Sequence, residues 1–107
     1  MKLVIAIVNH DDAAAVASGL TKAGFTATKL ATTGGFLRQG NTTFLVGTED
    51  EKVSAVIDIV KTYSSKRSQV IPDVGTYGLS EYANVPIEVS VGGATVFVVN
   101  VERFEKL

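Results

Sequence analysis

The chain has 107 residues and no cysteine, and 46% of its residues are hydrophobic, so disorder, disulfides and thiolate metal sites are excluded. Its net charge of −1 gives no electrostatic basis for binding a nucleic acid polymer. Residues 1–107 are expected to form one domain. The first apolar run, Leu3–Val8, is too short to cross a membrane and has no small-residue cleavage site after it. We therefore expect a cytoplasmic protein without membrane insertion.

The start of the chain predicts a strand followed by a helix. Leu3–Val8 lacks alternation and is rich in valine and isoleucine, which is typical of a strand buried on both faces. Gly24 suits the position just after a helix end. His10 is the only histidine, and a capping or solvated role fits it better than catalysis. The expected helix-start residues are Asn9, Asp11 and Asp12, and the apolar positions with helical spacing are Ala13, Val16, Ala17 and Leu20.

A glycine-rich turn between two predicted strands is the most informative part of the sequence. Phe25–Thr32 and Asn41–Gly47 are the strands, and the turn Gly34–Gly40 carries one aromatic residue, Phe36, and one arginine, Arg38. Glycine allows the backbone to approach a ligand closely, and successive N–H groups form anion-binding concavities. An aromatic ring there can stack on a base. With threonines at positions 26, 28, 32, 33, 42 and 43, the turn predicts a pocket for a flat, anionic nucleotide.

Two other interpretations of this turn can be weighed against its residues: a P-loop, which they do not fit, and a hairpin without a ligand, which stays open. The spacing from Gly35 to Gly40, Asn41 and Thr42 approaches a phosphate-binding P-loop. Asn41 stands where the P-loop lysine would be, however, and this turn joins two strands instead of a strand and a helix. The simpler alternative is a hairpin turn without a ligand, although such a turn needs fewer glycines.

The second half of the chain predicts another helix and a long loop. Thr48 and Glu51 have capping-box spacing at the start of this helix. Ser64–Val85 shows no period, and so long a segment is usually functional or disordered. The apolar stripe of the helix is Val53, Val56, Ile57 and Val60.

The last third predicts two strands and completes a fold class. Ile87–Val91 alternates like a half-buried strand, Gly92 and Gly93 give a hairpin signal, and Thr95–Val101 is the final strand before a tail at Glu102–Leu107. The order is βαββαβ plus a C-terminal strand, the plan of a ferredoxin-like α+β fold. Both helices are expected on one face of the sheet. The other face is apolar through residues such as Leu3, Ile5, Val89 and Val91, and we expect self-association to cover it.

Two segments of the sequence are similar to one known family. TTGGFLRQGNTT at residues 32–43 and VGGATVF at residues 91–97 resemble the PII-like cyclic di-AMP receptors, the PstA or DarA family, and the similarity extends along residues 1–107. The resemblance implies a PII-like, ferredoxin-like subunit that assembles as a homotrimer and binds cyclic di-AMP in clefts between subunits. It also implies a short T-loop at Gly34–Gly40 and an enlarged B-loop at Ser64–Val85.

The resemblance assigns ligand-binding roles by position. Thr28 is expected near a phosphate, Phe36 against an adenine, and Asn41 with the Gly47 backbone at the edge of an adenine. Gly35 and Leu37 are expected to shape the pocket around Phe36. The assigned residues of one subunit are Thr28, Gly35, Phe36, Leu37, Asn41 and Gly47, and those of the facing subunit are Gly92, Gly93 and Ala94.

One position departs from the family pattern. Thr26 stands where many members carry an arginine that contacts phosphate. Since a charge-assisted hydrogen bond contributes roughly 1.5–3 kcal/mol, its loss would weaken binding by about ten- to a hundredfold. Arg38, Lys29 or a cation of the long loop is expected to substitute for it. Gly24 also stands where an asparagine is expected.

The leading interpretation is a signal transduction protein that binds cyclic di-AMP and changes loop conformation to regulate an unknown downstream protein. The alternative is a PII-type regulator that responds to another nucleotide such as ATP. An enzyme is not expected. The sequence has one histidine, no cysteine and no pair of carboxylates beside the glycine turn, so no two residues are placed to act as general acid and general base. No catalytic residue, bound metal or cofactor is therefore assigned.

Overall fold

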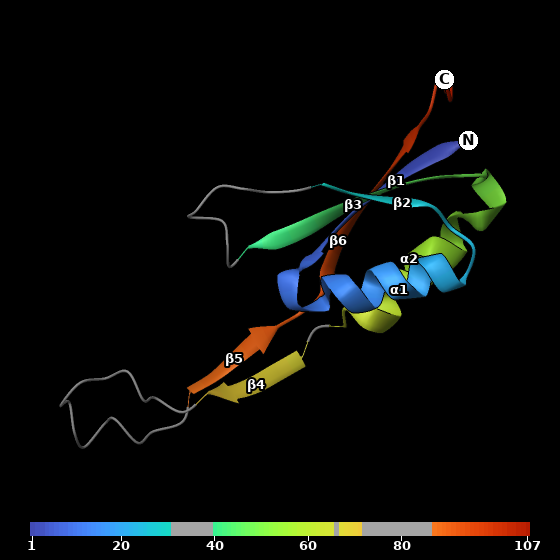
Figure 1. Ribbon diagram of the computed structural model, residues 1–107. Coiled ribbons are helices and arrows are strands. Elements are labelled where there is room, and N and C mark those ends of the chain that lie inside the picture. Colours follow the sequence, from blue (N-terminus) through green and yellow to red (C-terminus); the bar gives the residue numbers. More distant parts are fainter. Residues whose placement is uncertain (31–39, 66, 72–86) are drawn as a thin grey trace, which may run out of the picture.

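The computed structural model describes residues 1–30, 40–65, 67–71 and 87–107. Short 3₁₀ turns at His10–Asp12 and Asp50–Lys52 precede the two α-helices. The strands and helices are β1 (Lys2–Asn9), α1 (Ala13–Lys22), β2 (Ala27–Leu30), β3 (Asn41–Thr48), α2 (Val53–Tyr63), β4 (Arg67–Ile71), β5 (Ile87–Val91) and β6 (Ala94–Asn100) (Figure 1).

Four of these strands form one antiparallel sheet in the order β2-β3-β1-β6. β1 lies inside the sheet and pairs along its length with β3 and with β6. Both helices cover the same face of this sheet (Figure 1). The arrangement confirms the ferredoxin-like α+β fold class that the sequence predicts.

The fourth strand of the main sheet is β6, and the prediction that Ile87–Val91 joins that sheet is wrong. β5 pairs instead with β4, from Arg67↔Val91 to Ile71↔Ile87, in a separate two-stranded sheet. Gly92 and Gly93 both have φ of 85°, but they connect the two sheets and do not form a hairpin turn. β4 itself lies in the stretch expected to lack regular structure. Residues 72–86 of that stretch lie outside the described residues.

The hydrophobic core lies between the main sheet and the two helices. On β1, Val4, Ala6 and Val8 are fully buried beneath the helices, while the alternate residues Leu3, Ile5 and Ile7 are half-buried on the opposite face. The expectation that β1 is buried on both faces therefore does not hold within one chain. The other core residues are Ala13, Val16, Leu20, Phe44, Val46, Val56 and Val60.

The end of α1 follows the prediction. Gly24 has φ of 88° and donates its N–H to the Thr21 carbonyl at 3.0 Å, and Phe25 donates to the Leu20 carbonyl at 3.0 Å. This pair of bonds is a Schellman motif, in which glycine is favoured because the residue after the helix is left-handed. At the start, Asn9 Oδ1 accepts the Asp11 N–H at 2.8 Å, as expected of a cap.

The start of α2 differs from the prediction. Thr48 is the last residue of β3, where it is buried, and it does not cap the helix. Glu49 holds the position before the 3₁₀ turn without a side-chain capping bond, and Glu51 lies inside that turn. The proposed capping box is therefore wrong, because the strand runs one residue further than its apolar pattern indicates.

The two helices cross closely at a glycine, which gives a stability prediction. A Cβ at Gly19 would lie 2.5 Å from Cε2 of Tyr63 and 3.0 Å from Cγ2 of Ile59, so Gly19→Ala forces the Tyr63 ring to move. We expect this substitution to lower the free energy of unfolding by about 1–2 kcal/mol, because the cost of overpacking exceeds the roughly 1 kcal/mol that alanine gains over glycine inside a helix. Chemical denaturation measures it, with Ser18→Ala at the exposed neighbouring position as the control. Equal unfolding free energies for Gly19→Ala and wild type would contradict so close a crossing.

Candidate open-face ligand site

Two of the predicted ligand residues lie together at one end of the sheet face that the helices leave open. Thr28 is opposite Leu45 in the β2–β3 pairing, and Gly47 is opposite Leu3 in the β1–β3 pairing. Directly opposite residues share a face, and so do residues two apart on one strand. Val46, which lies between Leu45 and Gly47 on β3, is fully buried under the helices. Leu45, Gly47 and Thr28 therefore face the uncovered side.

A cavity of about 640 Å³ lies over this end of the open face, and we call it the open-face cavity. Its volume falls in the range of small-molecule sites. The sheet forms one wall, and the chain after β6 forms another. Its lining residues are Met1, Leu3, Thr26, Thr28, Leu45, Gly47, Val101, Phe104, Glu105 and Lys106.

Gly47 leaves room inside this cavity. Its φ is not in the left-handed region, unlike those of Gly24, Gly92 and Gly93, so the backbone conformation does not demand glycine. A Cβ built at Gly47 would meet no atom within 4 Å. The register with β2 ends at Val46, so the backbone of Gly47 also lies beyond the paired part of that edge strand. A larger side chain here would enter the cavity without disturbing the core.

The polar groups of the cavity suit an anion. Thr26 and Thr28 are exposed and supply hydroxyls, and Lys106 supplies an ammonium group. The carboxylate of Glu105 already accepts from Arg103, with Nε and Oε2 2.6 Å apart. Lys29, one of the cations expected to replace a charge at position 26, is opposite Phe44 and so lies on the helix side of the sheet.

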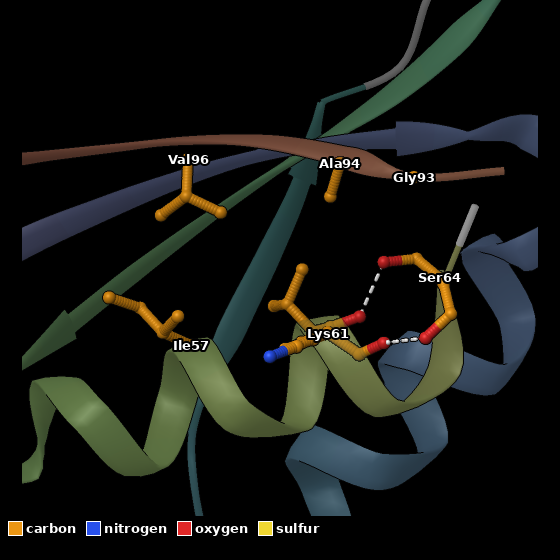
Figure 2. A pocket seen from close by; sticks show the side chains of 8 residues that line it. Ile57, Lys61, Ser64, Gly93, Ala94 and Val96 are labelled. Atoms are coloured by element: carbon orange, nitrogen blue, oxygen red, sulfur yellow. Dashed lines mark hydrogen bonds between the residues drawn. The ribbon is translucent and has the colours of Figure 1, made fainter.

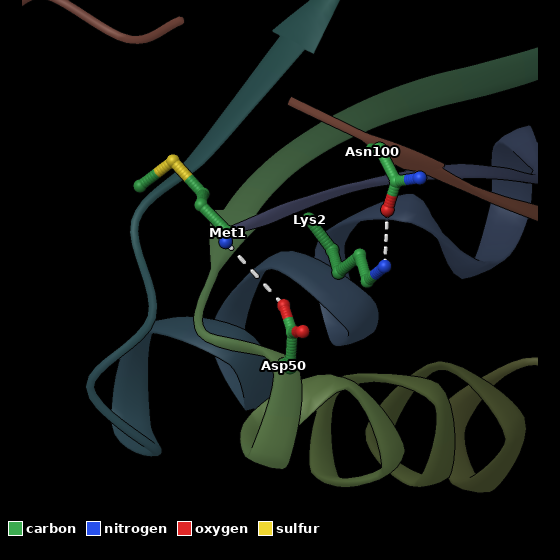
Figure 3. A network of polar contacts seen from close by, with 4 residues as sticks. All are labelled: Met1, Lys2, Asp50 and Asn100. Carbon is green, nitrogen blue, oxygen red and sulfur yellow. Dashed lines mark hydrogen bonds and ion pairs between the residues drawn. The ribbon is translucent and has the colours of Figure 1, made fainter. Parts of the chain in front are cut away.

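Contacts near the start of the chain frame this end of the molecule. The amino group of Met1 forms an ion pair with Asp50, with the nitrogen 3.4 Å from Oδ1 (Figure 3). Lys2 donates from Nζ to Oδ1 of Asn100, its directly opposite residue on β6. The Val101 N–H donates to the Met1 carbonyl at 3.2 Å, which continues the β1–β6 pairing into the tail. The chain is therefore anchored beside the cavity at the residue before the tail.

Asn41 lies far from this cavity in the same chain. It is exposed, opposite Asn9, at the other end of β3 from Gly47. Gly47 is six positions further along β3 than Asn41, which places the two about 20 Å apart. Gly35, Phe36 and Leu37 lie outside the described residues, as does Arg38.

Gly93 and Ala94 line a different cavity, of about 390 Å³, on the helix side of the sheet. Figure 2 shows Ala94 directed toward α2, with Ile57 and Ser64 across the cavity. Gly93 donates its N–H to the Ser64 carbonyl, and the Ser64 hydroxyl donates to the Val60 carbonyl. Gly92 precedes Gly93 in the link between β5 and β6. The structure therefore does not bring Gly92, Gly93 and Ala94 together with Thr28 and Gly47 within one chain.

Sequence reasoning missed the wall that the tail contributes. Phe104, Glu105 and Lys106 follow the last strand and carry no motif, so the sequence predicts only a tail there. The one signal that could have found them is topological. β6 runs antiparallel to β1, so the residues after β6 must emerge beside the start of β1.

A third cavity, of about 710 Å³, lies between the end of α1 and the start of α2. It shares Met1, Thr26 and Gly47 with the open-face cavity, so the two meet where the β2 pairing begins. Its other charged lining residues, Glu49, Lys52 and Asp58, include both signs and give it no preference for an anion.

The described residues show no second kind of site. Histidine and carboxylate side chains in the described ranges form no group of three that could hold a metal ion. His10 Nδ1 lies 3.4 Å from Thr42 Oγ1, at the opposite end of β3 from Gly47. Neither α1 nor α2, the α-helices of the described chain, has the length and apolar content to cross a membrane.

Comparison with known proteins places the chain in a family. A solved crystal structure, of a functionally unknown protein from Pediococcus pentosaceus ATCC 25745, is 44% identical in sequence and has a TM-score of 0.75, covering 99% of this chain and 96% of that one. A family model described as cyclic-di-AMP receptor matches residues 1–107, from the first strand to the tail that walls the cavity. The chain therefore belongs to the cyclic-di-AMP receptor family.

Proposed function

We propose that this protein binds cyclic di-AMP in the open-face cavity and acts as a signal transduction protein. The observation that carries the proposal is the cavity itself, in which Thr28 and the unfilled position at Gly47 lie beside each other. Membership in a receptor family favours a binding protein over an enzyme. The proposal joins a family-wide ligand to one place in this chain.

The lining of the cavity offers both kinds of contact that a nucleotide needs. The hydroxyls of Thr26 and Thr28 can donate to phosphate oxygens, and the Gly47 backbone can meet the edge of an adenine. Leu3 and Leu45 give the base an apolar surface, since they lie on the open face beside Gly47. Phe36, on the glycine turn, is proposed to stack on an adenine, because every base has a flat face on which an aromatic ring can stack.

A homotrimer is the proposed assembly. The open face exposes large apolar side chains, with Phe97 53% and Val99 44% exposed, and Ile5 between its paired neighbours on β3 and β6. Exposed apolar surface of this extent is typical of an interface. Within one chain, Gly93 and Ala94 line the cavity on the helix side and do not reach the open-face cavity. A second subunit would therefore have to supply Gly92, Gly93 and Ala94 to it. The trimeric number comes from the resemblance of the sequence to PII-like receptors.

Calorimetric titration tests the function and its alternative together. We expect cyclic di-AMP to bind at about one molecule per subunit, with ATP and cyclic di-GMP binding much more weakly or not at all. Binding of ATP in preference to cyclic di-AMP would favour a PII-type regulator of another nucleotide. No binding of any of the three would overturn the proposed function.

We propose that ligand binding regulates an unknown partner through the Gly34–Gly40 turn and the Ser64–Val85 segment. The β4–β5 sheet supports an output role, because it is separate from the main sheet and joined to it through Gly92 and Gly93. Trypsin can cut Ser64–Val85 only after Lys66 or Arg67. We expect cyclic di-AMP to slow this cleavage, because the ligand favours one state of the segment. Equal cleavage rates with and without ligand would leave the short turn as the only candidate switch.

A further inference from the structure

We infer that Lys106 supplies the positive charge that holds a phosphate of cyclic di-AMP in the open-face cavity. The inference rests on the proposed function, that this ligand occupies this cavity. Cyclic di-AMP carries two phosphodiester groups and therefore two negative charges. A protein that takes such a dianion from water must replace part of its hydration with donors, and charged donors form roughly twice as strong a bond as neutral ones.

The ion pairs of the other charged groups at the cavity single out Lys106. Among the described residues that line the cavity, Glu105 carries the one carboxylate, and its Oε2 pairs with Nε of Arg103 at 2.6 Å. The amino group of Met1, the other cation at the cavity, is held by Asp50 at 3.4 Å. Lys106 has no ion pair with any carboxylate in the described part of the chain. Within the described ranges, Lys106 is therefore the lining cation that has no ion pair with a carboxylate.

The neighbouring strands do not offer another cation to the cavity. Lys29 is on the helix side of β2, opposite Phe44, and Lys2 donates to Asn100 on the helix side of β1. Thr26 and Thr28 line the cavity with hydroxyls only. Among the described residues, the positive charge available to the phosphate is therefore on Lys106 in the tail, and the neutral donors are the hydroxyls of Thr26 and Thr28.

The tail can carry Lys106 to the cavity because Val101, the residue before the tail, is fixed. The Val101 N–H donates to the Met1 carbonyl at 3.2 Å, and Phe104 is one of the residues that line the same cavity. Lys106 follows only two residues later. The backbone at Lys106 need not be fixed more precisely, because the lysine side chain is flexible and its ammonium group can turn its donors toward a phosphate.

The test measures cyclic di-AMP affinity by calorimetry in wild type, Lys106→Gln, Lys106→Arg and the control Lys29→Gln. Lys29→Gln makes the same charge change on the other side of the sheet. We expect Lys106→Gln to weaken binding about tenfold at low salt, since the contact is charge-assisted but exposed. Lys106→Arg and Lys29→Gln should bind as wild type does. In roughly 0.5 M salt the difference should shrink, because exposed charges are screened.

A second substitution separates a phosphate contact from a general effect of the tail. Thr26 lines the same cavity, so Thr26→Arg in the Lys106→Gln background should restore affinity by returning one cation to it. A wild-type protein that binds, with Lys106→Gln binding equally well, would overturn the inference and leave the proposed function standing. Equal losses in Lys106→Gln and Lys106→Arg would also overturn it, because charge would not be what matters. A wild-type protein that does not bind would overturn the proposed function itself.

Discussion

Ile5→Lys is expected to convert the assembled protein into monomers and to abolish cyclic di-AMP binding with it. Ile5 lies on the central strand of the open face, directly between Leu45 of β3 and Phe97 of β6. In a single chain it is half-buried, so a lysine can reach water and the fold should survive. In a trimer the same ammonium group would be buried without a partner, which costs several kcal/mol per subunit.

Light scattering measures this result directly. Wild type should have three times the 11.3 kDa mass of one chain, and Ile5→Lys should have that mass once. Ser54→Lys, which adds the same charge at an exposed position of α2, should stay assembled. A wild-type mass of one chain would contradict the trimer, and an assembled Ile5→Lys that still binds ligand would show that the open face is not the interface.

Gly47→Leu is expected to lower cyclic di-AMP affinity by more than about a hundredfold without changing stability or assembly. The wild-type position is open, since a Cβ there meets nothing within 4 Å, and leucine would fill the space between Leu3 and Leu45 that the ligand needs. The ligand would have to displace the leucine side chain or lose its own contacts there, and either costs several kcal/mol of binding free energy. Each 1.4 kcal/mol corresponds to a tenfold change in affinity.

A graded series makes the Gly47 prediction sharper. Gly47→Ala adds one methyl group and should weaken binding less than Gly47→Leu, while both variants should unfold at a temperature no lower than wild type, because glycine in a strand is already unfavourable. Calorimetry and thermal unfolding of the same samples give both values. Full affinity in Gly47→Leu would place the ligand outside the open-face cavity.

The main elements of the fold could be predicted because local patterns agree with the tertiary structure. Alternation in β3 and helical spacing in α2 each match the face that the core buries, and Gly24 ends α1 because the motif there requires a left-handed residue. β4 could not be predicted in this way. Its five residues, Arg67–Ile71, gain their strand structure from pairing with β5, some twenty residues away in sequence, and no local pattern records that partner.

The candidate site was only partly predictable for a similar reason. The resemblance pointed to Thr28 and Gly47, and the β2–β3 register does bring them together. The tail wall depends on the β1–β6 register, which carries Asn100 to Lys2 and so delivers Phe104 and Lys106 to the same cavity. Local sequence patterns do not reveal the register between strands, and so they do not show which end of the sheet the tail reaches.

Amide hydrogen exchange with and without cyclic di-AMP tests most directly whether the ligand occupies the open-face cavity. Ligand should slow exchange in residues 26–30, 45–48 and 102–107, the three segments that wall this cavity. Residues 57–63 of α2, which include the lining residues Ile57, Val60 and Lys61 of the cavity between α2 and β6, serve as the comparison within the same chain. Protection confined to residues 57–63 and 93–96, with the open-face segments exchanging as in the free protein, would contradict the site proposed for this receptor.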